Sequence, residues 1–386
     1  MPLPDLPVVD VLPQLRDVLK DHTAAVLEAP PGAGKSTIVP LALLGEPWLA
    51  GRKLLMLEPR RIAARSIARR MAALLGEEAG QTVGYRTRLD VRVSTTTRIE
   101  VVTEGILTRM LQDDPALEDT AAVIFDEFHE RSLEADLGLA LTLEVRSHLR
   151  EDLRILVMSA TLAADAISAL LQNAAIVRAA GRSHPVTIHY RERPAGDPPA
   201  GVDRWRMFAA KIADAISESD GDLLAFLPGV PEIHRTSRLL AETDAIRDCD
   251  VLLLHGSLSA AEQDRVLAPA APARRRVVLA TNVAETSLTI EGVRVVVDSG
   301  LERRAVFDPA TGMSRLVTQR ISRASADQRC GRAGRTAPGV CYRFWTESEH
   351  RRLAEHSPAD ILDADLAPLA LELAIWGTGE PGALRW

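Results

Sequence analysis

The sequence predicts an α/β protein built from two tandem domains, each with a parallel β-sheet covered by helices. Short apolar runs alternate with longer helical patterns through most of the 386 residues. Continuous apolar runs of this kind are typical of strands buried on both faces. A stretch rich in proline and glycine interrupts the alternation once, at residues 181–202. At about 100–200 residues per domain, the length accommodates two domains.

The first predicted domain covers residues 1–180. Its predicted strands are the apolar runs Ala24–Leu27, Lys53–Leu57, Ala121–Phe125 and Arg154–Met158. Helical periodicity is found at Arg60–Leu75 and Leu133–Leu149. Because strands and helices alternate, neighbouring strands are expected to run parallel, with the helices as crossovers.

The second predicted domain covers residues 181–345. Its first residues, Gly181–Val202, contain four prolines and predict a linker or surface segment. Strands are then predicted at Asp222–Leu227, Asp250–Leu254, Arg276–Ala280 and Val293–Asp298, and helices at Asp203–Ser219, Pro231–Thr243 and Ala260–Leu267. Arg303–Arg323 alternates around a Pro-Ala-Thr-Gly turn, which predicts a β-hairpin. Residues 346–386 change to helical character, with a strongly apolar segment at Ala367–Trp376.

The composition excludes several classes of protein. Apolar residues make up 46% and charged residues 26%, which is typical of a folded chain and excludes pervasive disorder. The apolar runs are far shorter than the roughly 20 residues of a membrane helix, and the first residues lack a signal-peptide pattern. We therefore expect a cytoplasmic protein with no membrane partner. Cys249, Cys330 and Cys341 lack metal-ligand spacing, so no structural zinc is expected.

A phosphate-binding loop is predicted where the first strand ends. Residues 29–37 read Ala-Pro-Pro-Gly-Ala-Gly-Lys-Ser-Thr, a Walker A pattern whose backbone N–H groups turn inward around phosphates. Lys35 is expected to reach the phosphates and Ser36 to bind Mg²⁺. Lys35 is one of only four lysines among 46 basic residues, which strengthens the assignment. The predicted nucleotide contacts of this loop are Gly32, Ala33, Gly34, Lys35, Ser36 and Thr37.

An acidic motif follows the third predicted strand. Asp126 and Glu127 stand directly after it, and His129 follows two residues later. We expect Asp126 and Glu127, together with Ser36, to form the Mg²⁺ site, and Glu127 also to polarise the attacking water. His129 is expected to sense the γ-phosphate. A zinc site at His129 is disfavoured, because no cysteine or second histidine stands at ligand spacing.

An arginine-rich segment, Gln328–Arg335, supplies further catalytic candidates. It reads Gln-Arg-Cys-Gly-Arg-Ala-Gly-Arg. Gln328, Arg332 and Arg335 are predicted to contact the nucleotide, with the two arginines stabilising charge on the transferring phosphoryl group. A lysine could not present the same planar fork of donors. Cys330 within this segment is expected to be a packing residue.

These segments, taken in order from Val8 to Trp386, resemble the motifs of superfamily 2 DEAH-type RNA helicases, and among them the bacterial HrpB branch. Further matching segments are Glu58–Arg61, Thr103–Gly105, Ser159–Thr161, Phe226–Gly229, Leu254–Ser257 and Thr281–Ile290. The acidic motif reads Asp-Glu-Phe-His where most of these helicases have Asp-Glu-Ala-His.

The resemblance implies how the chain is organised. Both domains would be RecA-like, and ATP is the implied nucleotide. Residues 1–180 would be the ATP-binding helicase domain, 181–345 the C-terminal helicase domain, and 346–386 the start of a winged-helix-like region in a truncated chain. Arg70 and Leu301 match the positions that hold the nucleotide base, but Leu301 replaces an aromatic residue of the family. We therefore expect weak preference among nucleoside triphosphates.

The resemblance also implies single-stranded RNA as the partner, with 3′→5′ translocation. The implied RNA contacts are Arg60, Arg61, Thr103, His255 and Thr281, and the implied coupling residues are Ser159, Thr161, Asn282 and Ser287. The hairpin is expected to act as a wedge between strands.

The charge distribution agrees with an RNA partner despite a net charge of −7. Residues 52–109 hold twelve basic and six acidic side chains, and residues 301–352 hold eleven and five. Residues 110–170, in contrast, hold four basic and thirteen acidic side chains. Basic segments of this kind contact nucleic-acid phosphates without reading sequence.

Two alternatives remain from the sequence. One is a DNA translocase, which the motifs do not exclude. The other is an RNA-binding scaffold that uses ATP as a clamp and unwinds little, which the complete set of catalytic positions disfavours.

Overall fold

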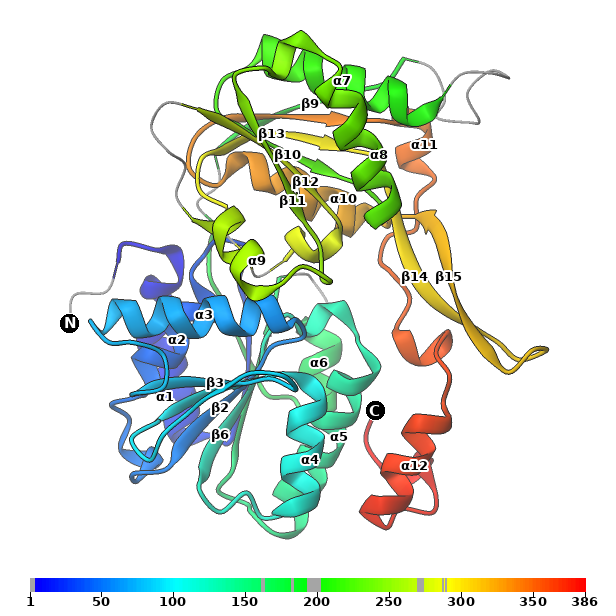
Figure 1. Ribbon diagram of the computed structural model, residues 1–386. Helices are drawn as coiled ribbons and strands as arrows, with labels where there is room; N and C mark the ends of the chain where they lie inside the picture. Colours follow the sequence, from blue (N-terminus) through cyan, green and yellow to red (C-terminus); the bar gives the residue numbers. More distant parts are fainter. Residues whose placement is uncertain are drawn as a thin grey trace. The chain divides into compact units, whose positions relative to one another are not determined.

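The computed structural model describes residues 4–160, 164–181, 184–192, 203–268, 274–286, 288 and 290–386. The chain forms two compact units, which are described separately (Figure 1). Unit 1 consists of Met1–Arg182, Phe307–Ser314 and Pro358–Trp386, and unit 2 of Ser183–Val306 and Arg315–Ser357. Unit 1 is therefore assembled from segments on both sides of unit 2 in the sequence.

Unit 1 contains an eight-stranded sheet in the order β4-β3-β5-β2-β6-β7-β1-β8. Its strands are β1 (Ala24–Glu28), β2 (Lys53–Leu57), β3 (Val83–Arg86), β4 (Val91–Arg92), β5 (Ile99–Val102), β6 (Thr120–Phe125), β7 (Arg154–Ser159) and β8 (Ala175–Arg178). Every neighbouring pair is parallel except β3 and β4. The carboxyl ends of β1, β6 and β7 therefore lie at one edge of the sheet.

Helices cover both faces of this sheet (Figure 1). They are α1 (Leu12–Asp21), α2 (Lys35–Leu43), α3 (Arg61–Leu74), α4 (Glu104–Asp113), α5 (Leu133–His148), α6 (Ala164–Leu170) and α12 (Ala367–Trp376). The face covered by α4, α5 and α6 buries alternate strand residues such as Val26, Leu55 and Val123. Helix α5 begins at Ser132, whose hydroxyl accepts a hydrogen bond from the Ala135 N–H at 3.1 Å.

The last residues of the chain pack onto this same face of unit 1. Leu369, Leu373 and Leu384 join the apolar cluster of α4 and α5. Trp376 Nε1 donates a hydrogen bond to Glu144 Oε2 at 2.8 Å. The other side of α12 leaves apolar side chains such as Leu371 exposed. The prediction that residues 346–386 begin a winged-helix-like region stays a prediction.

Unit 2 contains a six-stranded parallel sheet in the order β11-β12-β10-β13-β16-β9. Its strands are β9 (Val186–Tyr190), β10 (Asp222–Phe226), β11 (Cys249–Leu254), β12 (Arg275–Ala280), β13 (Val293–Asp298) and β16 (Gly339–Arg343). Its helices are α7 (Arg204–Glu218), α8 (Val230–Ala241), α9 (Ala260–Leu267), α10 (Arg323–Cys330) and α11 (Glu347–Arg351). Phe208 and Ile212 of α7 pack against Leu223, Val277 and Val295 of the sheet.

The predicted hairpin is confirmed as β14 (Leu301–Asp308) and β15 (Met313–Arg320), which form a separate two-stranded sheet. Gly312 adopts a left-handed conformation in its turn, with φ of 66°. Near this turn, the Phe307 N–H donates to the Asp363 carbonyl at 2.8 Å.

The predicted fold class is confirmed, but the sequence reading of Gly181–Val202 is partly wrong. Val186–Tyr190 forms the edge strand β9, which pairs with β16 rather than acting as a linker. Most of its side chains are exposed, so it has no apolar run that could have indicated a strand. Within the described residues, no helix is both long enough and apolar enough to span a membrane.

Candidate active site

The loop after β1 has the backbone of a phosphate cradle. Gly32 and Gly34 both adopt left-handed conformations, with φ of 85° and 91°. A Cβ at Gly34 would lie 2.8 Å from Leu6 Cδ1, so a side chain there would force Leu6 to move and would strain the left-handed backbone. Helix α2 begins directly afterwards at Lys35, so its N–H groups and its dipole face the loop. These residues fit a bound phosphate group.

The acidic motif lies at the same edge of the sheet. Asp126 and Glu127 follow β6, and both are buried. The Glu127 N–H donates to Asp126 Oδ1 at 2.9 Å, and Glu127 adopts a left-handed φ of 50°. Left-handed backbone at a residue other than glycine is uncommon and is held only by its surroundings. The sharp turn places both carboxylates beside the phosphate cradle.

Lys35 and Glu127 form a buried ion pair that joins these two segments. Lys35 Nζ lies 2.8 Å from Glu127 Oε1, and each side chain is 4% exposed. Burial alone lowers the pKa of Lys35, but Glu127 and Asp126 outweigh it, so the pKa is raised and the amine stays charged. Burial raises the pKa of Asp126 to about 6, against the opposing effect of Lys35.

His129 connects the acidic motif to the end of β7. The Ala160 N–H donates to His129 Nδ1 at 3.3 Å, so Nε2 carries the ring proton. His129 Nε2 lies 3.5 Å from Glu127 Oε2. Ser159 is fully buried at the end of β7, and its carbonyl accepts from the Ala29 N–H at 3.0 Å. The predicted coupling residue Ser159 is thus tied by its backbone to the start of the phosphate loop.

The donor atoms beside Asp126 fit a magnesium ion. Among the described residues, Asp126 Oδ2 is buried without a hydrogen bond of standard geometry, although the Ser36 hydroxyl lies near enough to lower the pKa of the carboxyl. No group of three or more His, Cys, Asp or Glu side chains in the described part of the chain could hold a metal by itself. A metal here would therefore take few protein oxygens and complete its shell elsewhere, as Mg²⁺ does with water and phosphates.

One of the predicted RNA contacts in unit 1, Arg60, contacts the residue directly after the acidic motif. Arg60 Nη2 forms an ion pair with Glu130 Oε2 at 3.0 Å. Thr103 precedes α4 as its N-cap residue and is half-buried, whereas Arg61 is exposed at the start of α3. Arg70, the predicted base contact, is exposed near the end of α3.

In unit 2, the arginine-rich segment forms the end of α10 and the turn after it. Arg332 is buried, and its guanidinium donates to the carbonyls of Glu285 and Leu288. Arg335 Nη1 donates to the Leu288 carbonyl at 3.0 Å. Gln328 is half-buried on α10. The catalytic roles of these three residues stay predictions.

Sequence reasoning missed the structural role of Arg329. This residue is 1% exposed; its Nε lies 2.8 Å from Glu285 Oε2 and its Nη1 lies 3.1 Å from Asp298 Oδ1. Burial lowers the pKa of Arg329, but the two carboxylates outweigh it and raise the pKa. Arg329 therefore anchors α10 in the core of unit 2. Three arginines stand within this short motif, and their sequence pattern does not indicate which of them anchors the helix.

The other predicted residues of unit 2 occupy turns after strands. His255 is buried after β11, with Nδ1 2.8 Å from Ser257 Oγ. Burial lowers the pKa of His255, and the nearby His234 lowers it further. Thr281 caps the turn that contains Asn282, and Leu301 is half-buried at the start of β14. Thr161 and Ser287 lie outside the described residues.

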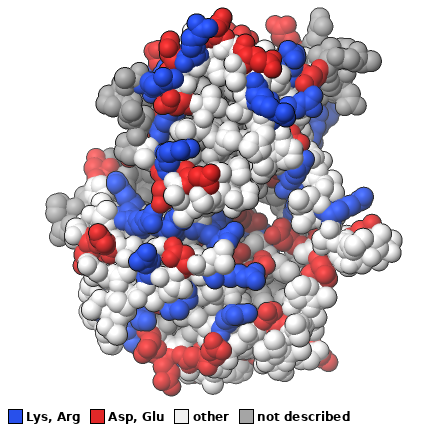
Figure 2. All heavy atoms as spheres, viewed as in Figure 1, with Lys and Arg blue, Asp and Glu red and all other residues white. Residues whose placement is uncertain are grey.

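Some of the arginines counted in the two basic segments are buried, so the count exceeds the positive charge at the surface. Figure 2 shows blue atoms gathered over α3, where Arg61, Arg69 and Arg70 are exposed. Arg65 of the same helix is buried, as is Arg343 of the second basic segment. Counting charges along the sequence does not separate these buried, structural arginines from exposed ones.

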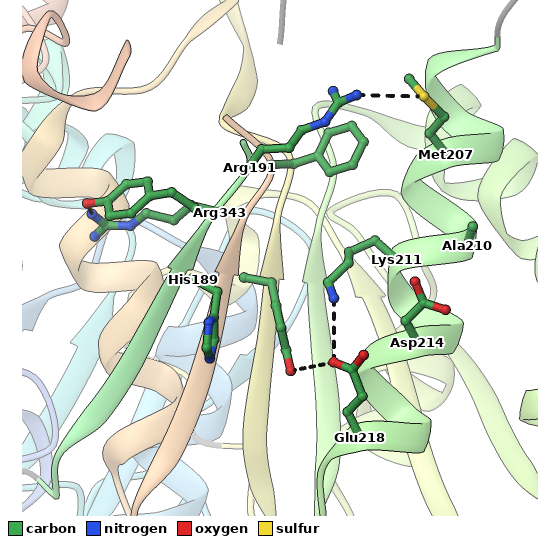
Figure 3. Close-up of a pocket in the computed structure, with 11 residues that line it drawn as sticks. His189, Arg191, Met207, Ala210, Lys211, Asp214, Glu218 and Arg343 are labelled. Atoms are coloured by element: carbon green, nitrogen blue, oxygen red, sulfur yellow. Dashed lines mark hydrogen bonds and ion pairs between the residues drawn. The ribbon is translucent and has the colours of Figure 1, made fainter. Parts of the chain in front are cut away.

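A cavity of about 550 Å³ lies in unit 2, away from every predicted site residue (Figure 3). Lys211 Nζ lies 4.0 Å from the centre of the Tyr342 ring and 3.6 Å from Glu218 Oε2. His189 stacks on the other side of this cluster, 5.1 Å from the Tyr342 ring. The charges of Lys211 and Glu218 offset one another, so this pair offers no net charge to a ligand.

Comparison with known proteins identifies matching families and relatives. The family described as DEAD/DEAH box helicase matches residues 10–170, and the helicase conserved C-terminal domain matches residues 208–337. ATP-dependent RNA helicase HrpB of Escherichia coli (strain K12) is 49% identical over 99% of this chain and 46% of that protein. ATP-dependent RNA helicase HrpA of the same organism is 35% identical over 98% of this chain and 29% of that protein.

A solved structure agrees with these matches. The crystal structure of the Escherichia coli DEAH/RHA helicase HrpB superposes with a TM-score of 0.91 at 48% identity. The match covers 99% of this chain and 48% of that one. The chain thus spans about half the length of HrpB, and less of the other relative.

Proposed function

The chain belongs to the DEAD/DEAH box helicases, and from this we propose that it is an ATP-dependent RNA helicase that couples nucleotide hydrolysis to 3′→5′ movement along single-stranded RNA. The observation that carries the proposal is the buried pair of Lys35 and Glu127 at the edge of the sheet. It joins a phosphate cradle to a carboxylate that can orient water.

In the proposed reaction, backbone N–H groups of residues 32–37 and the Lys35 amine bind the β- and γ-phosphates. Lys35 must then exchange part of its contact with Glu127 for the phosphates, which frees a Glu127 oxygen to accept a proton from water. Ser36, Asp126 and Glu127 would form the Mg²⁺ site, and the ion would supply positive charge at the phosphates when bound.

Unit 2 would supply the remaining charge. We assign Arg332, Arg335 and Gln328 to the phosphates of the nucleotide, with the two arginines following the pattern of arginine fingers. Arg332 would first have to leave the carbonyls of Glu285 and Leu288. The same proposal includes a domain division at residues 1–180 and 181–345. It also includes weak preference among nucleoside triphosphates and a cytoplasmic location.

RNA would bind through its phosphates at Arg60, Arg61, Thr103, His255 and Thr281. The exposed arginines of α3 support this assignment on the side of unit 1. Contacts with phosphates give affinity that falls steeply with salt but carries no sequence preference.

The experiment is phosphate release from ATP by the purified chain, with and without single-stranded RNA, over a series of salt concentrations. We expect RNA to stimulate hydrolysis and the stimulation to fall as salt rises. A Lys35→Met protein is the control for contaminating activity. Equal stimulation by DNA of the same sequence would favour a DNA translocase, and nucleotide binding without hydrolysis would favour an ATP-clamped scaffold.

A further inference from the structure

The residues directly after the acidic motif form a short turn with an unusual backbone. Phe128–Glu130 make one 3₁₀ turn, bounded by Glu127 at φ 50° and Arg131 at φ 52°. Two left-handed residues that are not glycine, four positions apart, need support from surrounding contacts. Because Glu127 is one end of this turn, whatever holds the other end also helps to place the Glu127 carboxylate.

The far end of the turn, Glu130–Ser132, is held by contacts from four directions. Glu130 pairs with Arg60 at 3.0 Å, from the loop before α3. Ser132 Oγ donates to Glu104 Oε1 at 2.5 Å, at the start of α4. Further contacts are the ion pair of Arg131 with Asp136 of α5 at 3.1 Å and the hydrogen bond from the Asp360 N–H to the Arg131 carbonyl at 3.0 Å.

Two of these contacts come from places where RNA is proposed to bind. Arg60 is itself a proposed phosphate contact, and Glu104 directly follows the proposed contact Thr103 in the sequence. A phosphate at Arg60 would compete with Glu130 for the same guanidinium. A phosphate at Thr103 would act on the first turn of α4, which carries Glu104. Phosphate binding at either residue would therefore change the contacts that hold the turn that begins at Glu127 and contains His129.

Glu104 is the titratable member of this set. Burial raises its pKa to about 8; the Ser132 hydroxyl opposes this rise, and the neighbouring acids Glu134, Glu130 and Asp360 add to it. At neutral pH the Glu104 carboxyl is therefore mostly uncharged. Above pH 8 it becomes a negative charge facing three acidic side chains, from α5, the turn and the C-terminal segment.

We propose that Glu130–Ser132 is a positioning element that links RNA binding at Arg60 and Thr103 to the placement of Glu127 and His129, with Glu104 as its key positioning residue. This inference rests on the proposed function, because it names the route by which RNA would stimulate hydrolysis within unit 1. It is distinct from the coupling residues Ser159, Thr161, Asn282 and Ser287. Glu104 acts through Ser132 and touches neither nucleotide nor RNA in this scheme.

The test compares Glu104→Ala and Glu104→Gln with the unsubstituted chain. Asp113→Asn is the matched control, because Asp113 is an exposed acid at the other end of the same helix. Phosphate release is measured with and without an oligouridylate RNA from pH 6 to pH 9.5, together with KM for ATP. Thermal unfolding of each protein shows whether it is folded.

We expect Glu104→Ala to keep its KM for ATP and to lose less of its basal rate than of its stimulation by RNA, which should fall about 3- to 30-fold. Glu104→Gln keeps the hydrogen bond to Ser132 and should restore stimulation. In the unsubstituted chain, stimulation should decline as pH rises through 8, and in Glu104→Gln this decline should be absent. Asp113→Asn should match the unsubstituted chain at every pH.

The two proposals fail in different ways. If RNA does not stimulate the unsubstituted chain, the proposed function itself is wrong. If RNA does stimulate it but Glu104→Ala is stimulated equally, the positioning role is wrong. A parallel loss of basal and stimulated rates in Glu104→Ala that Glu104→Gln does not rescue would show a merely structural residue, and would also overturn the inference.

Discussion

Replacing Glu127 by glutamine tests the centre of the candidate active site. The amide has the shape of the carboxylate, but it removes the negative charge 2.8 Å from Lys35 Nζ in a place where both side chains are 4% exposed. Loss of one partner of a buried ion pair costs about 3–5 kcal/mol when the other charge is left alone. Here the amide oxygen still accepts a hydrogen bond from Lys35, and Asp126 remains as a second negative charge. We therefore expect a smaller loss, about 1.5–3 kcal/mol, similar to a hydrogen bond to a charged group.

For a unit of this size, about 1.5–3 kcal/mol corresponds to a fall in Tm of roughly 3–12 °C for unit 1. Hydrolysis should fall about 10²- to 10⁴-fold, the usual contribution of a positioned base. Affinity for ATP should be retained or increased, because Lys35 gives up a weaker partner when it turns to the phosphates.

The assays are calorimetric unfolding, phosphate release, and binding of a fluorescent ATP analogue. Added nucleotide should raise the Tm of Glu127→Gln at least as much as that of the unsubstituted chain, since a ligand that binds more tightly stabilises the folded protein more at the same concentration. Glu118→Gln, an exposed carboxylate after α4, is the control. Unchanged hydrolysis in Glu127→Gln, or loss of ATP binding, would refute the role given to Glu127.

Three further predictions follow from the geometry. Arg329→Met should destabilise unit 2 by about 3–5 kcal/mol, because it leaves two buried carboxylates without their cation. Denaturant unfolding measures this change in stability. A loss below about 1 kcal/mol, which is typical of an exposed ion pair, would contradict the prediction. Gly34→Ala should cost roughly 1–3 kcal/mol through its left-handed backbone and its clash with Leu6, and should weaken ATP binding; an unchanged affinity would argue against a phosphate cradle. Glu104 has a raised pKa, so the stability of the chain is full below its ordinary value of 4.5 and declines as pH rises to about 8. The Tm of Glu104→Gln relative to the unsubstituted chain should therefore rise between pH 5 and 8 and level off above; a difference independent of pH would contradict the shift.

The phosphate cradle and the acidic motif could be predicted from the sequence because each is carried by consecutive residues. A Gly-x-Gly-Lys-Ser run after a strand is enough to predict the conformation of the loop and the start of the helix that follows it. The same holds for an acidic pair after an apolar strand. The predicted strands β1, β2, β6 and β7 agree with the structure for the same reason, since each is a continuous apolar run.

The contacts between these motifs could not be predicted in this way. The ion pair of Lys35 and Glu127 depends on β1 and β6 lying on either side of β7. Local periodicity in the sequence does not predict the order of strands in a sheet. Strand β9 was missed because its side chains are mostly exposed. Arg329 was not distinguished from Arg332 and Arg335 because three arginines in one short segment look alike until the packing of α10 is known.

The return of Pro358–Trp386 to unit 1 has a consequence for how the protein is made. Synthesis delivers the whole sheet of unit 1 first, then the residues of unit 2, and only afterwards α12. At about 5–20 residues per second, the apolar surface that later receives Leu369 and Leu373 stays open on the nascent chain for roughly 10–35 s. During that interval the first domain is exposed to aggregation and to chaperones, even though its own sheet has already left the ribosome. The sheet of unit 1 is therefore synthesised well before the segment that covers part of its apolar face.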